Sequence, residues 1–230
     1  QVNPGVQIEE RTFNPTPPDV DAAVERSDPQ KSYLSFSMDV KSAHKLLRVH
    51  PEEQGLLLFW ALGTLCHYIV CHFGAKFSAY WWARMGALLH RLLHHLLFVP
   101  HAGWLYVDDW LWQLEADTAP AYSCLLVVCL VAIGCPLSWH KLALSRSLIW
   151  IGIEVDLHFQ VWWLPQDKMQ RVAGFLEWVM QPGDKKARLQ FEQGTGLLLW
   201  IACIFPLFKP WLSEFYRILC RPSSTLVSCS

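Results

Sequence analysis

Short alternating blocks of apolar and polar residues, and one longer helical pattern, predict both strands and helices in this chain. Apolar residues fall at every second position over 33–40, which predicts a strand that ends on Asp39. Two more short strands are predicted at 56–62 and 65–71, because a Gly-Thr turn signal separates two apolar runs. Over 78–98, apolar residues recur every three or four positions, which is typical of an amphipathic helix.

The second half of the chain continues this mixture. Residues 104–114 are predicted to form a hairpin with Asp108 and Asp109 at its tip. Upstream, the Pro-rich residues 1–32 are predicted to be extended, apart from a short helix near 19–26. Strands gathered in one sheet with helices behind it predict an α+β fold. The other predicted elements are a helix at 119–133, a hairpin of 148–155 with 160–164, a helix at 166–180 opened by Pro165, and helical apolar sequence over 184–219 interrupted at Gly and Pro residues.

Composition indicates a chain with an unusually apolar surface. Hydrophobic residues make up 53% of the 230 residues and charged residues only 17%, against about 25% in typical globular proteins. Thirteen Trp residues add large apolar side chains, so we expect other domains or nucleic acid to cover part of the surface. The formal net charge of −1 favours no particular partner, although a free-standing nucleic-acid binder is usually basic.

Cysteine usage and the lengths of the apolar runs indicate reduced thiols and argue against a membrane protein. None of the eight Cys forms a CxxC pair, so no zinc ribbon is expected, and we interpret the thiols as reduced in an intracellular setting. The apolar runs 56–70, 125–137 and 196–208 each fall short of the roughly 18–20 residues that a membrane span needs. A multi-pass membrane protein is therefore the least favoured alternative, and no membrane partner is expected.

Three Asp residues carry the candidate chemistry. Asp108 and Asp109 lie in a strongly apolar setting, where buried charges must pair or bind metal, although the dipeptide alone is more often a solvated turn. Asp39 ends another apolar strand, so three carboxylates meet at one edge if the two strands are neighbours. Carboxylate oxygens suit Mg²⁺, and two such ions about 3.5–4 Å apart serve phosphoryl transfer. The pattern predicts a site for two Mg²⁺ ions, with Mn²⁺ as the alternative.

Five segments resemble the motifs of reverse transcriptases, in the same order and with fitting spacings over residues 33–175. The implied source is a retrotransposon, with the DIRS-like elements that carry a tyrosine recombinase as the subtype considered. The segments are Ser37-Met38-Asp39-Val40-Lys41-Ser42-Ala43, which resembles the segment of the first catalytic Asp; His72-Phe73-Gly74-Ala75-Lys76-Phe77-Ser78-Ala79, which resembles the Phe-Gly loop and its helix; Tyr106-Val107-Asp108-Asp109, which matches the YxDD box; Ala132-Ile133-Gly134 with Lys141; and Ile151-Gly152-Ile153-Glu154-Val155-Asp156, which resembles the hairpin that grips the primer.

The resemblance implies a role for individual residues. Asp39, Asp108 and the backbone of Val40 would bind the metal ions, and Asp109 would complete and support this catalytic site. Lys141 would lie near the triphosphate as a proton donor. The residues implied in nucleotide or template binding are Val40, His44, Phe73, Gly74, Lys76 and Tyr106, and those implied in gripping the primer are Ile151 and Gly152.

The resemblance also implies a fold, a set of domains and a set of partners. The fold would be a polymerase palm, an antiparallel sheet backed by helices, with a partial helical thumb and incomplete fingers. The partners would be an RNA or DNA template with its primer, deoxynucleoside triphosphates, and further domains of a larger polyprotein. The implied domains are an extended lead-in or fingers remnant at 1–32, the palm at 33–165, a thumb-like helical region at 166–220 and a disordered tail at 221–230.

The implied activity is that of an RNA-directed DNA polymerase, which adds deoxynucleotides to a primer 3′-hydroxyl by two-metal phosphoryl transfer. The chain departs from the family pattern at His44, where many relatives have an aromatic gate against a 2′-hydroxyl. In the family, residues of the fingers bind the triphosphate, and the sequence upstream of Asp39 has no clear match to them. These departures and the low charge keep open the alternative of a degenerate palm that binds nucleic acid without turnover.

A second cluster of titratable residues lies near the end of the predicted helix 78–98. His90 and His94 are four residues apart, with His95 and His101 nearby, and such spacing can bind zinc. Because no matching third ligand is found, a solvated or phosphate-facing helix surface is the favoured interpretation.

Overall fold

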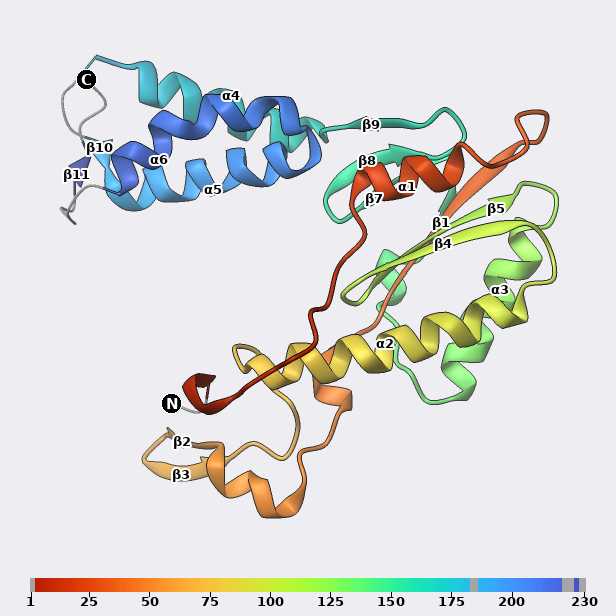
Figure 1. Ribbon diagram of the computed structural model, residues 1–230, viewed down its shortest axis with the longest axis horizontal. Helices are drawn as coiled ribbons and strands as arrows, with labels where there is room; N and C mark the ends of the chain where they lie inside the picture. The colour runs from red at the N-terminus through yellow and green to blue at the C-terminus, as the bar shows by residue number, and fades with distance from the viewer. Residues whose placement is uncertain (1–2, 183–185, 221–225, 228–230) are drawn as a thin grey trace. The chain divides into compact units, whose positions relative to one another are not determined.

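The computed structural model describes residues 3–182, 186–220 and 226–227, and the chain divides into two compact units, Gln1–Trp162 and Trp163–Ser230 (Figure 1). The elements in chain order are η1 (Asn3–Gly5), α1 (Pro17–Val24), β1 (Tyr33–Asp39), η2 (Ala43–Leu46), η3 (Pro51–Leu56), β2 (Leu58–Ala61), β3 (Thr64–His67), α2 (Lys76–Leu96), β4 (His101–Tyr106), β5 (Asp109–Glu115), α3 (Ala119–Ala132), η4 (Trp139–Lys141), β6 (Ala143–Ser145), β7 (Ser147–Trp150), β8 (Ile153–Asp156), β9 (Val161–Trp163), α4 (Gln166–Met180), β10 (Lys186–Ala187), α5 (Arg188–Ile204), η5 (Pro206–Leu212), α6 (Ser213–Leu219) and β11 (Leu226–Val227).

A four-stranded sheet of order β4-β5-β1-β6 forms the centre of the first unit. The strand β1 pairs antiparallel with β5 along its whole length, from Tyr33 opposite Glu115 to Asp39 opposite Asp109. Because successive side chains of a strand point to opposite faces, this register decides which residues enter each core. A three-stranded sheet, β7-β8-β9, follows it in the chain.

Both faces of the central sheet are buried. Phe36 and Met38 of β1 and Trp112 of β5 lie in one core, where they pack with residues of α2 and α3. Leu111 of β5 and Trp104 of β4 lie in a second core with α1, β7 and β8. Figure 1 shows α2 and α3 on one side of the sheet and α1 with β7 and β8 on the other. The sheet is therefore an apolar slab whose exposed ends are the places available for chemistry.

The α+β class and most of the predicted elements are confirmed. The strand at β1, the hairpin β4–β5 and the helices α2, α3 and α4 all form, and the predicted strands at 56–62 and 65–71 form as the shorter β2 and β3. The prediction of one strand over 148–155 is wrong. The chain turns back at Ile151 and Gly152, whose φ angles are +45° and +84°, and β7 pairs with β8. The apolar run continues through this turn, so the sequence pattern did not reveal it.

The second unit, Trp163–Ser230, is helical with a small aromatic core. Phe175 of α4 packs with Phe191 of α5, and the rings of Phe191 and Phe215 stack with centroids 5.6 Å apart. The helix α5 continues through Gly194, which was predicted to interrupt it. A Cβ at this position would lie 2.1 Å from the Phe175 ring, so glycine allows the two helices to approach. The predicted disordered tail at 221–230 lies outside the described residues except for β11, which pairs with β10.

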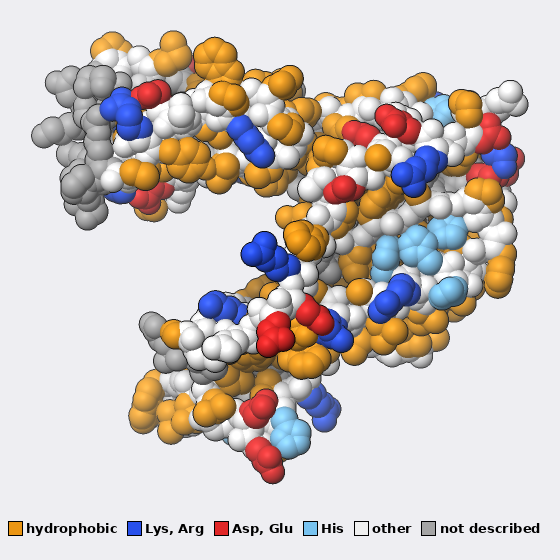
Figure 2. Space-filling model, viewed as in Figure 1, with side chains coloured by type: hydrophobic (Ala, Val, Ile, Leu, Met, Phe, Trp, Pro, Cys, Tyr) orange, Lys and Arg blue, Asp and Glu red, His pale blue; other side chains and the backbone are white. Residues whose placement is uncertain are grey.

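The exposed apolar surface predicted from composition is found on the hairpin β2–β3. Leu58, Trp60, Leu62 and Leu65 each expose half or more of their surface. Figure 2 shows hydrophobic side chains gathered over this part of the first unit. Across the described residues, no helix combines the length and the hydrophobicity that crossing a membrane requires.

His90, His94 and His101 form a hydrogen-bonded chain beside the sheet. The indole Nε1 of Trp110 donates to Nδ1 of His90 at 3.2 Å. Nε2 of His90 lies 3.1 Å from Nε2 of His94, and Nδ1 of His94 lies 2.8 Å from Nε2 of His101. Nδ1 of His101 lies 2.7 Å from the carbonyl of Val99. Because the indole can only donate, Nδ1 of His90 accepts, and each ring then donates one hydrogen bond to the next acceptor in the chain. One proton on each ring satisfies all of these hydrogen bonds, so all three imidazoles are assigned as neutral.

Burial favours the uncharged form of His90 and His94. Burial and the neighbouring His94 lower the pKa of His90 to about 4, and burial and the neighbouring His101 lower the pKa of His94 to about 4. Figure 2 shows histidines gathered over α2 and the β4–β5 hairpin. The interpretation of His90 and His94 as a solvated or phosphate-facing surface needs correction, because neutral rings bonded to one another offer no charge to a phosphate. Zinc binding would require breaking a chain that uses both ring nitrogens of His94.

We expect the contribution of His90 and His94 to the free energy of unfolding to fall as the pH is lowered from about 6.5 to about 4. Unfolded His titrates near 6.5, whereas His90 and His94 titrate near 4 in the folded protein. Within this window these two residues bind more protons in the unfolded chain than in the folded protein, so their titration favours unfolding in acid. The substitution His94→Gln should reduce this pH dependence, as measured by urea denaturation at several pH values.

His95 offers a matched control because it is exposed and adjacent to His94. The substitution His95→Gln should change the pH dependence less than His94→Gln does, because the charge of His95 is only a minor cause of the lowered pKa of His94. If His94→Gln and the wild type lose equal free energy of unfolding between about pH 6.5 and about pH 4, the neutral imidazoles do not cause the pH dependence.

Candidate active site

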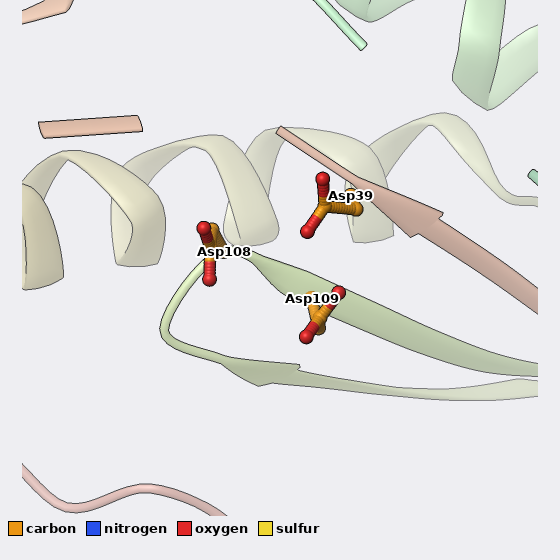
Figure 3. A group of neighbouring side chains, drawn as sticks. All are labelled: Asp39, Asp108 and Asp109. Carbon is orange, nitrogen blue, oxygen red and sulfur yellow. The ribbon is translucent and has the colours of Figure 1, made fainter. Parts of the chain in front are cut away.

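The candidate site lies where the β1–β5 ladder ends. Asp39 is the last residue of β1 and is paired directly with Asp109, the first residue of β5. Asp108 belongs to the turn that joins β4 to β5. The N–H of Val40, the residue after β1, donates to the carbonyl of Asp108 at 3.0 Å, so this segment holds the turn as β1 holds the strand. Figure 3 shows Asp39 on one strand and the other two carboxylates at the adjacent hairpin tip, with a helix behind them.

The three carboxyl groups share one small volume. Asp39, Asp108 and Asp109 each offer an oxygen, and these atoms lie within 4.8 Å of one another. Asp39 is 5% exposed, and the other two residues are partly buried. Nζ of Lys141 donates to Oδ2 of Asp39 at 2.6 Å and lies 3.7 Å from Oδ1 of Asp109. One ammonium group facing three carboxyl groups leaves the site short of positive charge.

Burial, hydrogen bonds and mutual repulsion give the three carboxyl groups different pKa values. Burial raises the pKa of Asp39, but hydrogen bonds from Lys141 and Ser138 outweigh it and hold that pKa below its usual value. Burial and a hydrogen bond with Asp39 raise the pKa of Asp109 to about 7. Burial and the charge of Asp39 also raise the pKa of Asp108. The fully ionised set is therefore unfavourable until a cation compensates it.

The donor set fits a hard divalent cation. Three carboxylate groups offer only oxygen ligands, which Mg²⁺ and Mn²⁺ accept, and their partial burial gives a bound ion less competition from solvent. Within the described ranges this is the one group of His, Cys, Asp or Glu residues with the spacing of a metal site. Asp39, Asp108 and Asp109 are thus the residues that could hold the metal. A backbone can bind a cation only through its carbonyl oxygen, so the carbonyl is the group that Val40 could add.

A cavity of about 810 Å³ opens beside the carboxyl groups. Tyr106 of β4 and the turn residues Ile151 and Gly152, between β7 and β8, lie on its wall together with Asp39 and Lys141. The structure therefore brings the segment predicted to grip the primer to the cavity that the carboxylates face.

The residues predicted to bind nucleotide or template through the loop before α2 lie elsewhere. Gly74 has a φ of +90°, in the left-handed region, and Lys76 is the first residue of α2. Phe73 is 73% exposed, and its ring lies edge-on to that of His44 with centroids 5.1 Å apart. Neither His44 nor Phe73, Gly74 or Lys76 lines the carboxylate cavity. Their predicted roles therefore depend on contacts outside this cavity.

Three further residues of the site were not predicted from the sequence. The N–H of Ser138 donates to the carbonyl of Asp39 at 2.8 Å. The indoles of Trp82 and Trp150 donate to backbone carbonyls of the turn that carries Asp108. Trp82 lies in the predicted amphipathic helix 78–98, but periodicity says nothing about where an indole N–H points.

Comparison with known proteins identifies the fold but no family. No protein-family model matches the sequence, and no curated protein matches it. Among solved structures, a foamy viral protease–reverse transcriptase dRH in complex with double-stranded DNA matches with a TM-score of 0.67 and 13% identity, covering 99% of this chain and 37% of the other. A foamy viral protease–reverse transcriptase in complex with an RNA/DNA hybrid matches with a TM-score of 0.63 and 14% identity, covering 90% and 26%.

A third structure, the foamy viral protease–reverse transcriptase in complex with double-stranded DNA, has a TM-score of 0.61 and 13% identity, and the match covers 99% of this chain and 44% of the other. At these identities the likeness shows a shared fold, an α+β architecture like that of a reverse transcriptase. The chain spans less than half the length of each of these three neighbours.

We expect Asp108→Asn to raise the free energy of unfolding by about 1 kcal/mol in the absence of divalent metal, because it removes one of three clustered negative charges. Millimolar Mg²⁺ should raise the melting temperature of the wild type and raise that of the variant less, because a ligand that binds only the folded state stabilises it. Thermal denaturation with and without Mg²⁺ measures both effects.

The matched control is Asp117→Asn, since Asp117 is exposed and lies outside the cluster. It should respond to Mg²⁺ as the wild type does. A wild-type melting temperature that Mg²⁺ does not change, or changes equally in Asp108→Asn, would show that the three carboxylates do not bind the ion.

Proposed function

We propose that this chain is an RNA-directed DNA polymerase domain, which adds deoxynucleotides to the 3′-hydroxyl of a primer. The single observation that carries the proposal is the convergence of Asp39, Asp108 and Asp109 within 4.8 Å at one end of a sheet. The fold likeness to reverse transcriptases supports it, because this fold is shared with proteins that were solved in complex with double-stranded DNA or an RNA/DNA hybrid.

In this proposal Asp39 and Asp108 bind two Mg²⁺ ions, with Asp109 and the carbonyl of Val40 completing the site. Two ions bound there would lower the pKa of the primer 3′-hydroxyl and neutralise the charge on the triphosphate and the pyrophosphate. Mn²⁺ offers the same preference for oxygen ligands and is the alternative metal.

The remaining residues of the cavity would position the reactants. Lys141, hydrogen-bonded to Asp39, would place its ammonium group beside the triphosphate and supply a proton to the leaving group. The turn at Ile151 and Gly152 would support the primer end, since it shares the cavity with the carboxylates. Tyr106, on the wall of the same cavity, would contact the nucleotide or the template.

The loop before α2 would complete the binding of template and incoming nucleotide. Gly74 has no side chain and a left-handed backbone, so a base or phosphate could approach it closely. Phe73 is exposed and would stack on a base, and Lys76 would contact a phosphate. His44, in edge contact with Phe73, would meet the sugar of the incoming nucleotide.

The proposal extends to the organisation and origin of the chain. Residues 33–165 would form the palm and 166–220 part of a thumb, with 1–32 as a remnant of the fingers. Further domains of a larger polyprotein would supply the rest, since the three neighbours are more than twice as long as this chain. The motif set supports a retrotransposon origin, with a DIRS-like element as the subtype.

The purified chain should extend a DNA primer on an RNA template when deoxynucleoside triphosphates and Mg²⁺ are present. Asp108→Asn should lower the rate by more than about 100-fold, since loss of a metal ligand should exceed the roughly 10- to 100-fold cost of losing an outer-shell partner. Gel-resolved primer extension measures the rate, and Asp117→Asn serves as the control that keeps it.

Two results would argue against a polymerase. A wild-type chain that binds the primer–template duplex in fluorescence anisotropy but never extends it would favour the degenerate, binding-only alternative. Extension that persists in Asp108→Asn would mean that the chemistry takes place elsewhere.

The substitution His44→Tyr should lower the incorporation of ribonucleotides relative to deoxynucleotides by about tenfold or more, because a larger ring at this position would clash with a 2′-hydroxyl. The measurement compares kcat/KM for matched ribo- and deoxynucleoside triphosphates in the wild type and the variant. An unchanged ratio would place His44 away from the sugar.

A further inference from the structure

The turn that carries Asp108 has a conformation that its own residues disfavour. Val107 has a φ of +56°, in the left-handed region. A β-branched residue is a true outlier there, and such backbone strain costs about 1–3 kcal/mol unless the surroundings over-determine it. The apolar side chain of Val107 packs against the core that α2 and α3 share with the sheet, which accounts for only part of the constraint.

Three donors from three separate segments of the chain hold the backbone at the tip of this hairpin. Nε1 of Trp82, in α2, donates to the carbonyl of Val107 at 2.8 Å. The N–H of Val40 donates to the carbonyl of Asp108 at 3.0 Å. Nε1 of Trp150, in β7, donates to the carbonyl of Asp109 at 3.4 Å. Three consecutive carbonyls are therefore fixed, and the direction in which each peptide unit points is fixed with them.

The two indoles are rigid anchors. Trp82 is 1% exposed and Trp150 is 2% exposed, so neither ring can turn away without disrupting a core. The α2 backbone also passes close to the hairpin, since a Cβ added at Gly86 would lie 2.9 Å from Leu105 of β4. Trp82 is one helical turn before Gly86, so the helix presents its indole to the turn from a short distance.

We infer that Trp82 is a positioning residue for the catalytic carboxylates, with Trp150 as its weaker partner on the other side of the turn; this inference rests on the proposed polymerase function. The indole N–H of Trp82 fixes the peptide unit before Asp108 and thereby fixes the direction of the Asp108 side chain. Mutation of outer-shell partners of this kind typically lowers metal affinity or activity roughly 10- to 100-fold. Trp82 does not line the carboxylate cavity, so its effect on the reaction would be indirect.

The decisive experiment deletes the N–H and keeps the ring. Trp82 is replaced by Phe and, separately, by benzothienylalanine, which has the shape of Trp with sulfur in place of the N–H. Both variants should lower kcat for primer extension roughly 10- to 100-fold and weaken binding of Mn²⁺, measured by electron paramagnetic resonance, while KM for the nucleotide changes little. Trp150→Phe should have a smaller effect, because its hydrogen bond is longer.

Trp81→Phe is the matched control, since Trp81 is adjacent on α2 and 54% exposed. It should keep the wild-type kcat and Mn²⁺ affinity. Because Trp82→Phe also removes core volume, the benzothienylalanine variant decides the question: wild-type kcat and Mn²⁺ affinity in that variant would overturn the inference. A wild type without extension activity would refute the proposed function, whereas the comparison of Mn²⁺ affinities would still test the role of Trp82.

Discussion

The antiparallel register that pairs Asp39 with Asp109 is the constraint on which the rest of the site depends. In a strand, a slip of one residue moves every side chain to the opposite face. Such a slip of β1 against β5 would take Phe36 and Met38 out of the core that they share with α2 and α3, and it would also separate Asp39 from the hairpin tip. The packing that stabilises the sheet therefore enforces the position of the carboxylates.

This coupling explains how an apolar chain can hold several acidic groups close together. The two cores on the faces of the sheet stabilise the fold, whereas repulsion among the carboxyl groups at the end of the β1–β5 pairing destabilises it. Lys141 offsets part of that cost, while the raised pKa values of Asp108 and Asp109 show that much of it remains. A site that destabilises the folded state in the absence of its ligand is typical of functional sites, where activity and stability oppose each other.

Patterns that follow from local chemistry were predictable, and contacts between distant side chains were not. The alternation over β1 and the proline before α4 located those elements, and the motif spacing located Asp39, Asp108 and Lys141. The β7–β8 turn was not predicted, because the apolar run continues through Ile151 without a polar break. The histidine chain and the indole donors depend on side-chain directions across α2 and the sheet, which no periodicity encodes.

The most direct test of the account is a crystal structure of the chain soaked with Mn²⁺, in which anomalous scattering locates the ion. Anomalous density is expected within coordinating distance of both Asp39 and Asp108. Two results would contradict the claim that these strands build one metal site. One is density that contacts only one of these two residues, and the other is density at other places in the protein but none at the hairpin tip.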